Sequence, residues 1–125
     1  MTTATATMTI QEVASRYNEL AQEEKWFEIQ DELFSDDVQS IEPPGSKFLP
    51  NAEGKANVRQ KGEEWVKNVE AVHSARTTKP IIAANHFVVG REKEMTVKGM
   101  GRIQVSQLMM YEVRDGQIVK EQFFY

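Results

Sequence analysis

Residues 111–121 read YEVRDGQIVKE, two stretches of strand-like composition on either side of the dipeptide Asp115-Gly116. Asp-Gly accommodates the positive φ angles of a two-residue turn, so this stretch predicts a β-hairpin. Strand-like segments separated by turn residues surround this turn, and they span 71–83, 86–97, 102–113 and 118–125. Their spacing predicts an antiparallel meander. Pro80 lies inside the first of these segments and indicates a bulge or an edge position.

The first half of the chain has the apolar spacing of helices. Apolar residues recur at three- and four-residue steps over 10–21, and Thr9 with Glu12 forms a capping-box pattern at the start of this segment. Further helical patterns cover residues 26–34 and 54–69. Three helices and one sheet predict an α+β fold in which the helices cover one face of a curved antiparallel sheet.

The length of 125 residues suits one domain, which we expect to span residues 9–125 after a disordered or frayed tail of residues 1–8. Lys and Arg total 15 and Asp and Glu total 19, and this balance argues against nucleic-acid and anionic-membrane partners. No apolar run approaches the roughly 20 residues of a membrane span. The chain has no cysteine, which excludes disulfides and thiolate chemistry and agrees with the cytoplasmic location that we expect.

Glu42 is the most prominent candidate for chemistry. It follows residues 38–41, which alternate as a short edge strand would, and it precedes the rigid pair Pro43-Pro44. A carboxylate held in this way is well placed for proton transfer. The alternative is a solvated carboxylate at the mouth of the loop over residues 46–53, because Glu is seldom buried.

Four motifs in this order carry a resemblance to a known family. They are residues 36–38 (DDV), 42–45 (EPPG), 54–56 (GKA) and the hairpin 111–121, and together they resemble the SnoaL-like branch of the NTF2-like superfamily over about residues 10–125. The resemblance implies a cone-shaped α+β barrel with a pocket closed by the helices, and dimers formed through the outer face of the sheet. That superfamily includes ketosteroid isomerases, polyketide cyclases, dehydratases, epoxide hydrolases and binding proteins, so the fold leaves the function open.

The comparison with ketosteroid isomerases implies a catalytic pair. Arg16-Tyr17 and Glu42-Pro43 resemble the positions of the oxygen-binding tyrosine and the carboxylate base of those enzymes. An enolate forms only if charge on oxygen is stabilised while the C–H proton leaves, which is why the chemistry needs both groups. Met109 stands where the family has a second oxyanion donor, and methionine donates no hydrogen bond. Efficient steroid isomerisation is therefore not expected, and Tyr17 also fits a purely structural place on the apolar stripe of its helix.

Further pocket residues are expected at strand ends and on inner faces, namely Trp65, His73, His86, Met109, Tyr111 and Phe123. Strand parity places Gln107, Met109 and Tyr111 on one face, which the isomerase comparison implies to be the inner one. Glu121 and Gln122 lie on opposite faces of the last strand, and one of them can add a polar group to the pocket. The histidines also suit structural or exposed positions, and no spaced cluster of ligands predicts a metal site.

Two functions follow from these expectations. The first is a cofactor-independent isomerase, cyclase or dehydratase that uses a carboxylate base on a small apolar carbonyl or cyclic compound. The second is a non-catalytic module that binds a small molecule or a protein. No motif implies a cofactor, because Gly99 and Gly101 lie between strands and do not open a helix. A homodimer through the outer sheet face is expected in either case.

Overall fold

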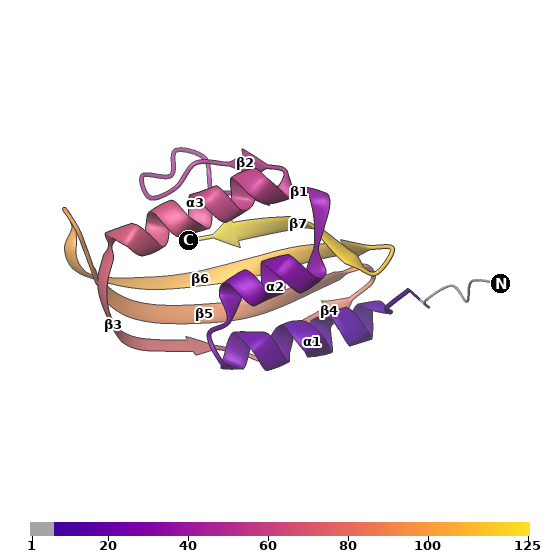
Figure 1. Ribbon diagram of the computed structural model, residues 1–125. Coiled ribbons are helices and arrows are strands. Elements are labelled where there is room, and N and C mark those ends of the chain that lie inside the picture. The colour runs from indigo at the N-terminus through magenta and orange to yellow at the C-terminus, as the bar shows by residue number, and fades with distance from the viewer. Residues whose placement is uncertain (1–6) are drawn as a thin grey trace.

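The computed structural model describes residues 7–125 and has three helices on one side of a seven-stranded sheet (Figure 1). The helices are α1 (Ile10–Gln22), α2 (Trp26–Leu33) and α3 (Lys55–Asn68). The predicted α+β class, with three helices covering one curved sheet, is confirmed. Of the predicted N-terminal tail, residues 1–6 lie outside the described residues.

The starts of α1 and α3 follow from local features of the sequence. At α1 the Glu12 amide donates to Thr9 Oγ1 over 3.2 Å, and the Thr9 amide donates to Glu12 Oε1 over 3.0 Å, so the predicted capping box is present. α3 begins after Gly54, whose φ of 89° lies in the region that favours glycine. Within residues 7–125, no helix is long and apolar enough to cross a membrane.

The sheet is mixed and open. Its strands are β1 (Phe34–Ile41), β2 (Ala52–Glu53), β3 (Val69–Thr77), β4 (Ile81–Ala83), β5 (His86–Val97), β6 (Gly101–Arg114) and β7 (Gln117–Phe124). Their order is β2-β1-β7-β6-β5-β3, and β4 pairs with β5. The prediction of an all-antiparallel sheet is wrong at one pair, because β1 runs parallel to β7. These two strands are far apart in the sequence, so no hairpin dictates their relative direction.

The strand before Glu42 is longer and more central than predicted. β1 starts at Phe34, directly after α2, and pairs with β7 on one side. On its other side Gln39 and Ser40 pair with the two residues of β2, which lie in the stretch predicted to be a loop. The prediction of an edge strand is therefore wrong. A strand as short as β2 has no periodicity from which it could be predicted.

Two turn predictions are confirmed. Asp115 has a φ of 51° and Gly116 a φ of 74°, as the two-residue turn between β6 and β7 requires. A Cβ on Gly116 would also lie 2.8 Å from Thr7 Cγ2, so a close approach of the chain excludes a side chain there. Pro80 lies in the break between β3 and β4, which pair with opposite halves of β5 and form the edge of the sheet.

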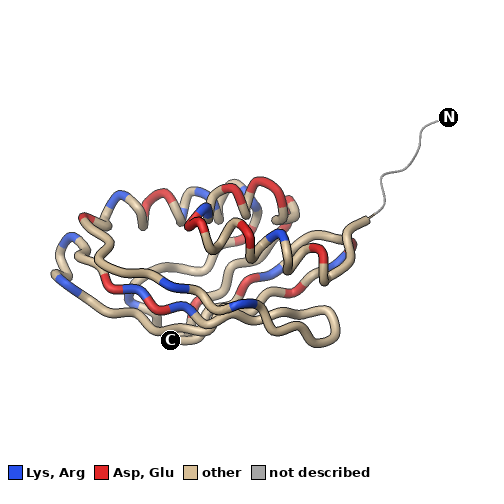
Figure 2. The backbone as a smooth tube through the Cα atoms, turned by 90° about the horizontal axis from the view of Figure 1, so that it is seen from below, with Lys and Arg blue, Asp and Glu red and all other residues tan. Residues whose placement is uncertain are grey.

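The core lies between the helices and the inner face of the sheet. Tyr17 on α1 is fully buried against Phe87 and Tyr111, with ring centroids 5.0 Å and 4.8 Å away. Along β5 the inner positions include the apolar Phe87 and Val89 but also the charged Arg91, which is only 6% exposed. Figure 2 shows acidic and basic residues interspersed along the helices and strands. Arg91 differs from most of these charged residues, because its side chain is buried.

Candidate functional site

A cavity of about 230 Å³ lies between the helices and the concave inner face of the sheet. Its apolar walls come from α2, α3 and the sheet and include Trp26, Phe34, Trp65, Met95, Met109 and Phe123. Its polar lining includes Gln30, Glu42, Arg91, Lys93, Gln107, Tyr111 and Glu121. An apolar pocket with a few convergent polar groups is the usual form of a small-molecule site.

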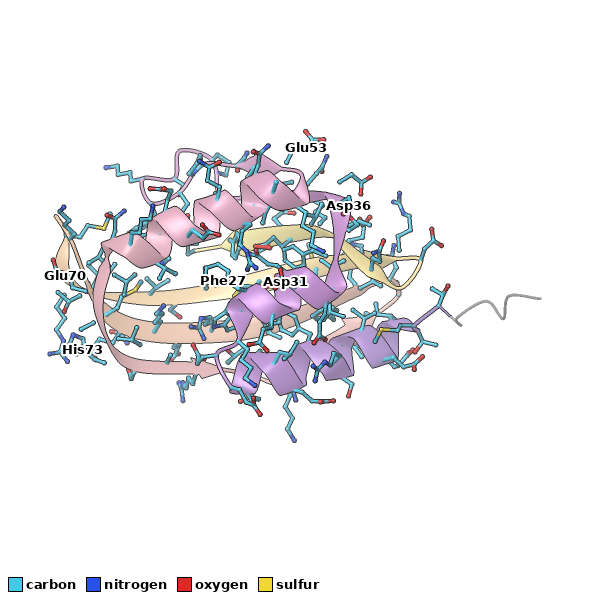
Figure 3. All side chains as sticks on the ribbon, viewed as in Figure 1. Phe27, Asp31, Asp36, Glu53, Glu70 and His73 are labelled. Carbon is cyan, nitrogen blue, oxygen red and sulfur yellow. The ribbon has the colours of Figure 1, made fainter. Side chains whose placement is uncertain are left out.

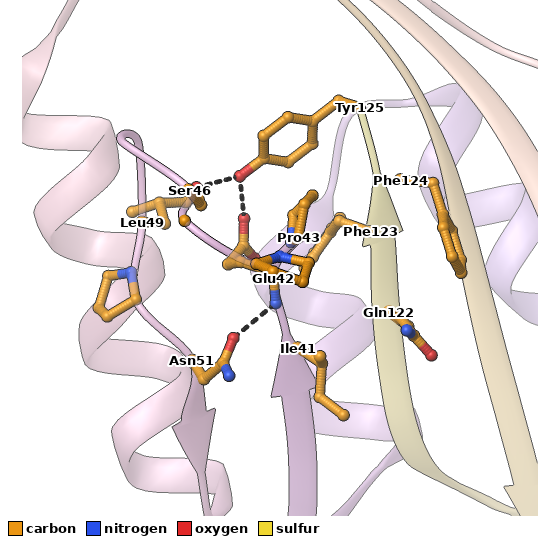
Figure 4. A pocket seen from close by; sticks show the side chains of 13 residues that line it. Ile41, Glu42, Pro43, Ser46, Leu49, Asn51, Gln122, Phe123, Phe124 and Tyr125 are labelled. Atoms are coloured by element: carbon orange, nitrogen blue, oxygen red, sulfur yellow. Dashed lines mark hydrogen bonds between the residues drawn. The ribbon is translucent and has the colours of Figure 1, made fainter.

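Glu42 lies just beyond the end of β1 and is 6% exposed. Its Oε2 is 2.9 Å from Lys61 Nζ, and its Oε1 accepts a hydrogen bond from the Tyr125 hydroxyl over 2.7 Å. Its backbone amide donates to Asn51 Oδ1 over 2.7 Å, which ties the strand end to the loop before β2 (Figure 4). The carboxylate is therefore buried, ion-paired and held on both oxygens.

Lys61 supplies the buried positive charge beside Glu42, and sequence reasoning did not single it out. Its side chain is only 7% exposed, and Nζ also donates to Ser40 Oγ over 2.7 Å. The residue follows Val58 and precedes Trp65 at helical spacing, so it shares the inward face of α3. A lysine on that stripe, opposite a predicted buried acid, was the signal that could have identified it.

Glu121 is the second buried carboxylate of this cluster. It lies on the inner face of β7, where it pairs with Ser40 of β1 on one side and Tyr111 of β6 on the other. Burial, the largest effect, raises the pKa of Glu121 to about 7. The negative charge of Glu42 raises the pKa further, while Lys61 and a hydrogen bond from Ser40 lower it. Two carboxylates thus share one ammonium group.

The two tyrosines form a buried pair. The Tyr17 hydroxyl donates to the Tyr111 hydroxyl over 2.9 Å, and burial raises the pKa of both side chains. Tyr111 lines the cavity, whereas Tyr17 lies behind it in the core. Because the Tyr111 oxygen accepts the hydrogen bond from Tyr17, its own hydroxyl proton is free to point toward the cavity.

The other residues predicted for the pocket divide into two groups. Trp65, Met109, Tyr111 and Phe123 line the cavity, and so does Gln107, as strand parity predicts. His73 instead lies on β3 near the periphery, where its Nε2 is 2.8 Å from Thr96 Oγ1 (Figure 3). His86 is 3.5 Å from Glu112 and does not line the cavity either. The structure therefore brings Glu42 together with one tyrosine and three apolar candidates, but with neither histidine.

A basic end of the cavity is formed by β5. Arg91 Nη2 and Nη1 are 2.7 Å and 3.1 Å from the carboxylate of Glu24, and the guanidinium carbon is 4.5 Å from the ring centre of Trp26. Lys93 follows two residues later on the same face. Burial, and then the positive charge of Arg91, lower the pKa of Lys93. The charge of residues 91–98 predicts a protruding hairpin edge, and this prediction is wrong at Arg91, because the helices cover this face of β5 and its side chain is buried.

A second depression, of about 650 Å³, lies between the Pro43-Pro44 loop and the end of β7 (Figure 4). It shares Glu42, Leu49, Phe123 and Tyr125 with the inner cavity. The Tyr125 hydroxyl lies between Glu42 and Ser46, so this ring separates the two spaces.

Among residues 7–125, no group of three or more Asp, Glu or His side chains is arranged to hold a metal ion.

Comparisons with known proteins agree with the fold described above. The family model described as a SnoaL-like domain matches residues 8–125. A structure from Mesorhizobium loti with the proposed assignment of SnoaL-like polyketide cyclase has a TM-score of 0.88 at 28% identity, covering 94% of this chain and 100% of its own. A ketosteroid isomerase-like protein from Catenulispora acidiphila, in complex with trimethylamine, has a TM-score of 0.69 at 17% identity over 94% and 87% of the two chains. No curated protein matches the sequence.

Proposed function

Because the chain belongs to the SnoaL-like domain family, we propose that it binds a small, largely apolar molecule and acts on it as a cofactor-independent acid–base catalyst. The observation that carries this proposal is the pair of buried carboxylates, Glu42 and Glu121, around Lys61 at the wall of an apolar cavity. Such groups serve isomerisation, cyclisation or dehydration of a carbonyl or cyclic compound, because each of these reactions moves a proton to or from carbon.

The two carboxylates have different parts in this proposal. Glu121, with a pKa of about 7, is populated in both protonation states near neutral pH and takes the proton from carbon and returns it. Glu42, the base expected from the sequence, keeps its ion pair with Lys61 and orients the substrate from the neighbouring wall. Glu42 is thus held by the lysine, whereas Glu121 exchanges its proton near neutral pH.

Oxygen stabilisation comes from the tyrosine pair. Tyr111 donates its hydroxyl proton to the substrate oxygen on which negative charge develops. Tyr17 does not touch the cavity and is a positioning residue, because its hydrogen bond orients the Tyr111 hydroxyl. Met109 lines the same wall without a donor, and loss of one oxyanion donor costs about 2.7–4 kcal/mol of transition-state stabilisation. A cavity of about 230 Å³ also favours a substrate smaller than a steroid.

The test begins with a thermal-shift screen of small carbonyl, lactone and epoxide compounds, followed by incubation of the hits and product analysis. For a converted compound we expect Glu121→Gln to lower kcat by about 10²–10⁴-fold, because the general base is gone. Glu53→Gln, on the exposed end of β2, is the matched control and keeps full activity. A Glu121→Gln variant with unchanged kcat would overturn the assignment of the base.

A non-catalytic binding module is the second candidate, and one observation favours it. Both oxygens of Glu42 are already bonded, to Lys61 and to Tyr125, as in a structural ion pair. In that case hits from the same screen bind and emerge chemically unchanged. Conversion of any hit by the wild type but not by Glu121→Gln distinguishes the enzyme from the module.

We also propose a homodimer through the outer face of the sheet. Leu108 on β6 and Phe124 on β7 are cross-strand neighbours there and are 52% and 45% exposed, and Ile81 at the sheet edge is 70% exposed. Exposed apolar patches of this kind mark protein interfaces. Sedimentation is expected to show a species of twice the 14.3 kDa chain mass, and Leu108→Lys is expected to shift it to the monomer. A wild type that stays monomeric at high concentration contradicts the dimer.

A further inference from the structure

Most charges that line or flank the cavity have a partner of opposite sign within the protein. Glu42 pairs with Lys61 at 2.9 Å, and the same lysine acts on Glu121. Arg91 pairs with Glu24 at 2.7 Å. Glu42 and the guanidinium of Arg91 therefore each have a counter-charge before any ligand enters.

Lys93 differs from these groups. Among residues 7–125, no carboxylate lies within 4.0 Å of its Nζ, and no hydrogen bond from this amine is formed. Its Cα partners across the sheet are Val105 on β6 and Ala75 on β3, which offer no charge. Arg91 on the same face of β5 repels it, and Glu24, which is already bonded to Arg91, attracts it less than Arg91 repels it. A partly buried ammonium group in a mainly apolar cavity is costly unless a negative group joins it.

The position of Lys93 also limits the shape of a ligand that binds both Lys93 and Glu121. Along β6 the residues facing Lys93 and Glu121 are Val105 and Tyr111, which are six positions apart. Six residues of strand extend about 20 Å, and the two long side chains shorten the gap to be bridged. A ligand that touches both ends is therefore elongated, with apolar atoms against Met109, which lies between positions 105 and 111 of β6.

We propose that the ligand of this cavity is an elongated, mostly apolar monoanion, a carboxylate or an enolate, whose charged end binds Lys93 while its other end lies at Glu121. This inference rests on the proposed function for the reacting end, and it names the class of substrate. Gln30 supports a polar end group as well. Its side chain lines the cavity, and its Oε1 is buried without a hydrogen-bond partner among the described residues. A hydroxyl or amide donor on the ligand satisfies that oxygen.

The test uses unreactive probes at pH 7, trans-cinnamate and 4-phenylbutyrate, each compared with its primary amide by isothermal titration calorimetry. We expect the wild type to bind each acid about tenfold or more tightly than its amide, because only the acid forms a charge-assisted hydrogen bond with Lys93. Lys93→Met is expected to remove this preference and Lys93→Arg to keep it. Lys98→Met, at an exposed lysine just beyond the same strand, is the matched control.

Several outcomes would overturn the proposal. They are equal binding of acid and amide, no binding of either acid, and a preference for acids that survives in a folded Lys93→Met protein. Glu121→Gln separates this inference from the proposed catalysis, because it removes turnover and leaves the Lys93-dependent preference for acids in place. An acid preference in a protein that converts no compound keeps the anion site and rejects the enzyme.

Discussion

The two ends of the cavity treat buried charge in opposite ways. At the acidic end Glu42, Glu121 and Lys61 come from β1, β7 and α3, and all three side chains are nearly excluded from solvent. At the basic end Arg91 is buried, but its partner Glu24 is 44% exposed at the end of α1. The acidic end is thus compensated internally, whereas the basic end depends on a group at the surface. A closed cluster suits proton transfer, and an incompletely compensated one suits binding.

Among variants at the two ends of the cavity, Lys61→Met is expected to have the largest effect on stability. The variant leaves two buried carboxylates without a counter-charge, which costs about 3–5 kcal/mol of unfolding free energy at pH 8. The loss is expected to shrink toward pH 5, because protonated carboxyls need no counter-charge. Urea denaturation at the two pH values measures it. The control is Lys67→Met at an exposed position of the same helix, and equal losses in both variants would contradict the assigned role of Lys61.

The second effect is the pH dependence of stability that comes from Glu121. Its pKa of about 7 in the folded protein exceeds the ordinary 4.5, so the folded state binds more protons between these values. Stability from this group is present below about pH 4.5 and is lost as pH rises through 7. This difference between the folded and the ordinary pKa corresponds to roughly 3 kcal/mol of unfolding free energy. Denaturation of the wild type and Glu121→Gln from pH 4 to 8 is expected to show the variant gaining by this amount. Parallel curves would show that the carboxyl titrates normally.

A smaller effect is expected from Arg91→Met at the basic end. Its partner Glu24 is close to the surface and regains water when the guanidinium is removed, so no buried charge is left alone. We expect a loss of about 1–2 kcal/mol, mostly from contact with the Trp26 ring. Thermal unfolding beside Lys61→Met measures the difference between the ends. A loss as large as that of Lys61→Met would show that the two ends are equivalent.

The smallest effect is expected from Tyr17→Phe. It removes the hydrogen bond to Tyr111 but keeps the ring packed against Phe87, so the stability loss is about 1 kcal/mol. With a substrate in hand, kcat is expected to fall while KM changes little, because Tyr17 orients an oxygen donor without touching the ligand. Tyr111→Phe should lower kcat more. A larger fall for Tyr17→Phe would place the substrate oxygen on Tyr17 instead.

Sequence reasoning worked best where one local rule decided the outcome. The Thr9 and Glu12 capping box and the Asp115-Gly116 turn both depend on neighbours a few residues away. Strand parity placed Gln107, Met109 and Tyr111 on one face, but only the isomerase comparison made that face the inner one. Sequence reasoning failed where distant segments meet. The parallel pairing of β1 with β7 and the short strand β2 have no local signature. Tyr17 was expected at the pocket and lies behind Tyr111, since periodicity defines the inner stripe of a helix but not its depth.

By itself the sequence determined the α+β class, the helices, the turns and a carboxylate held by two prolines, because caps, periodicity and proline geometry act within a few residues. Only the tertiary structure decided which groups that carboxylate contacts. Lys61 reaches Glu42 from α3, and Glu121 reaches the same cluster from β7, so the charge balance of the site exists only after three distant segments pack together. The same packing buries Arg91 and Lys93, because a charged residue on a strand becomes part of a cavity only when helices cover its face.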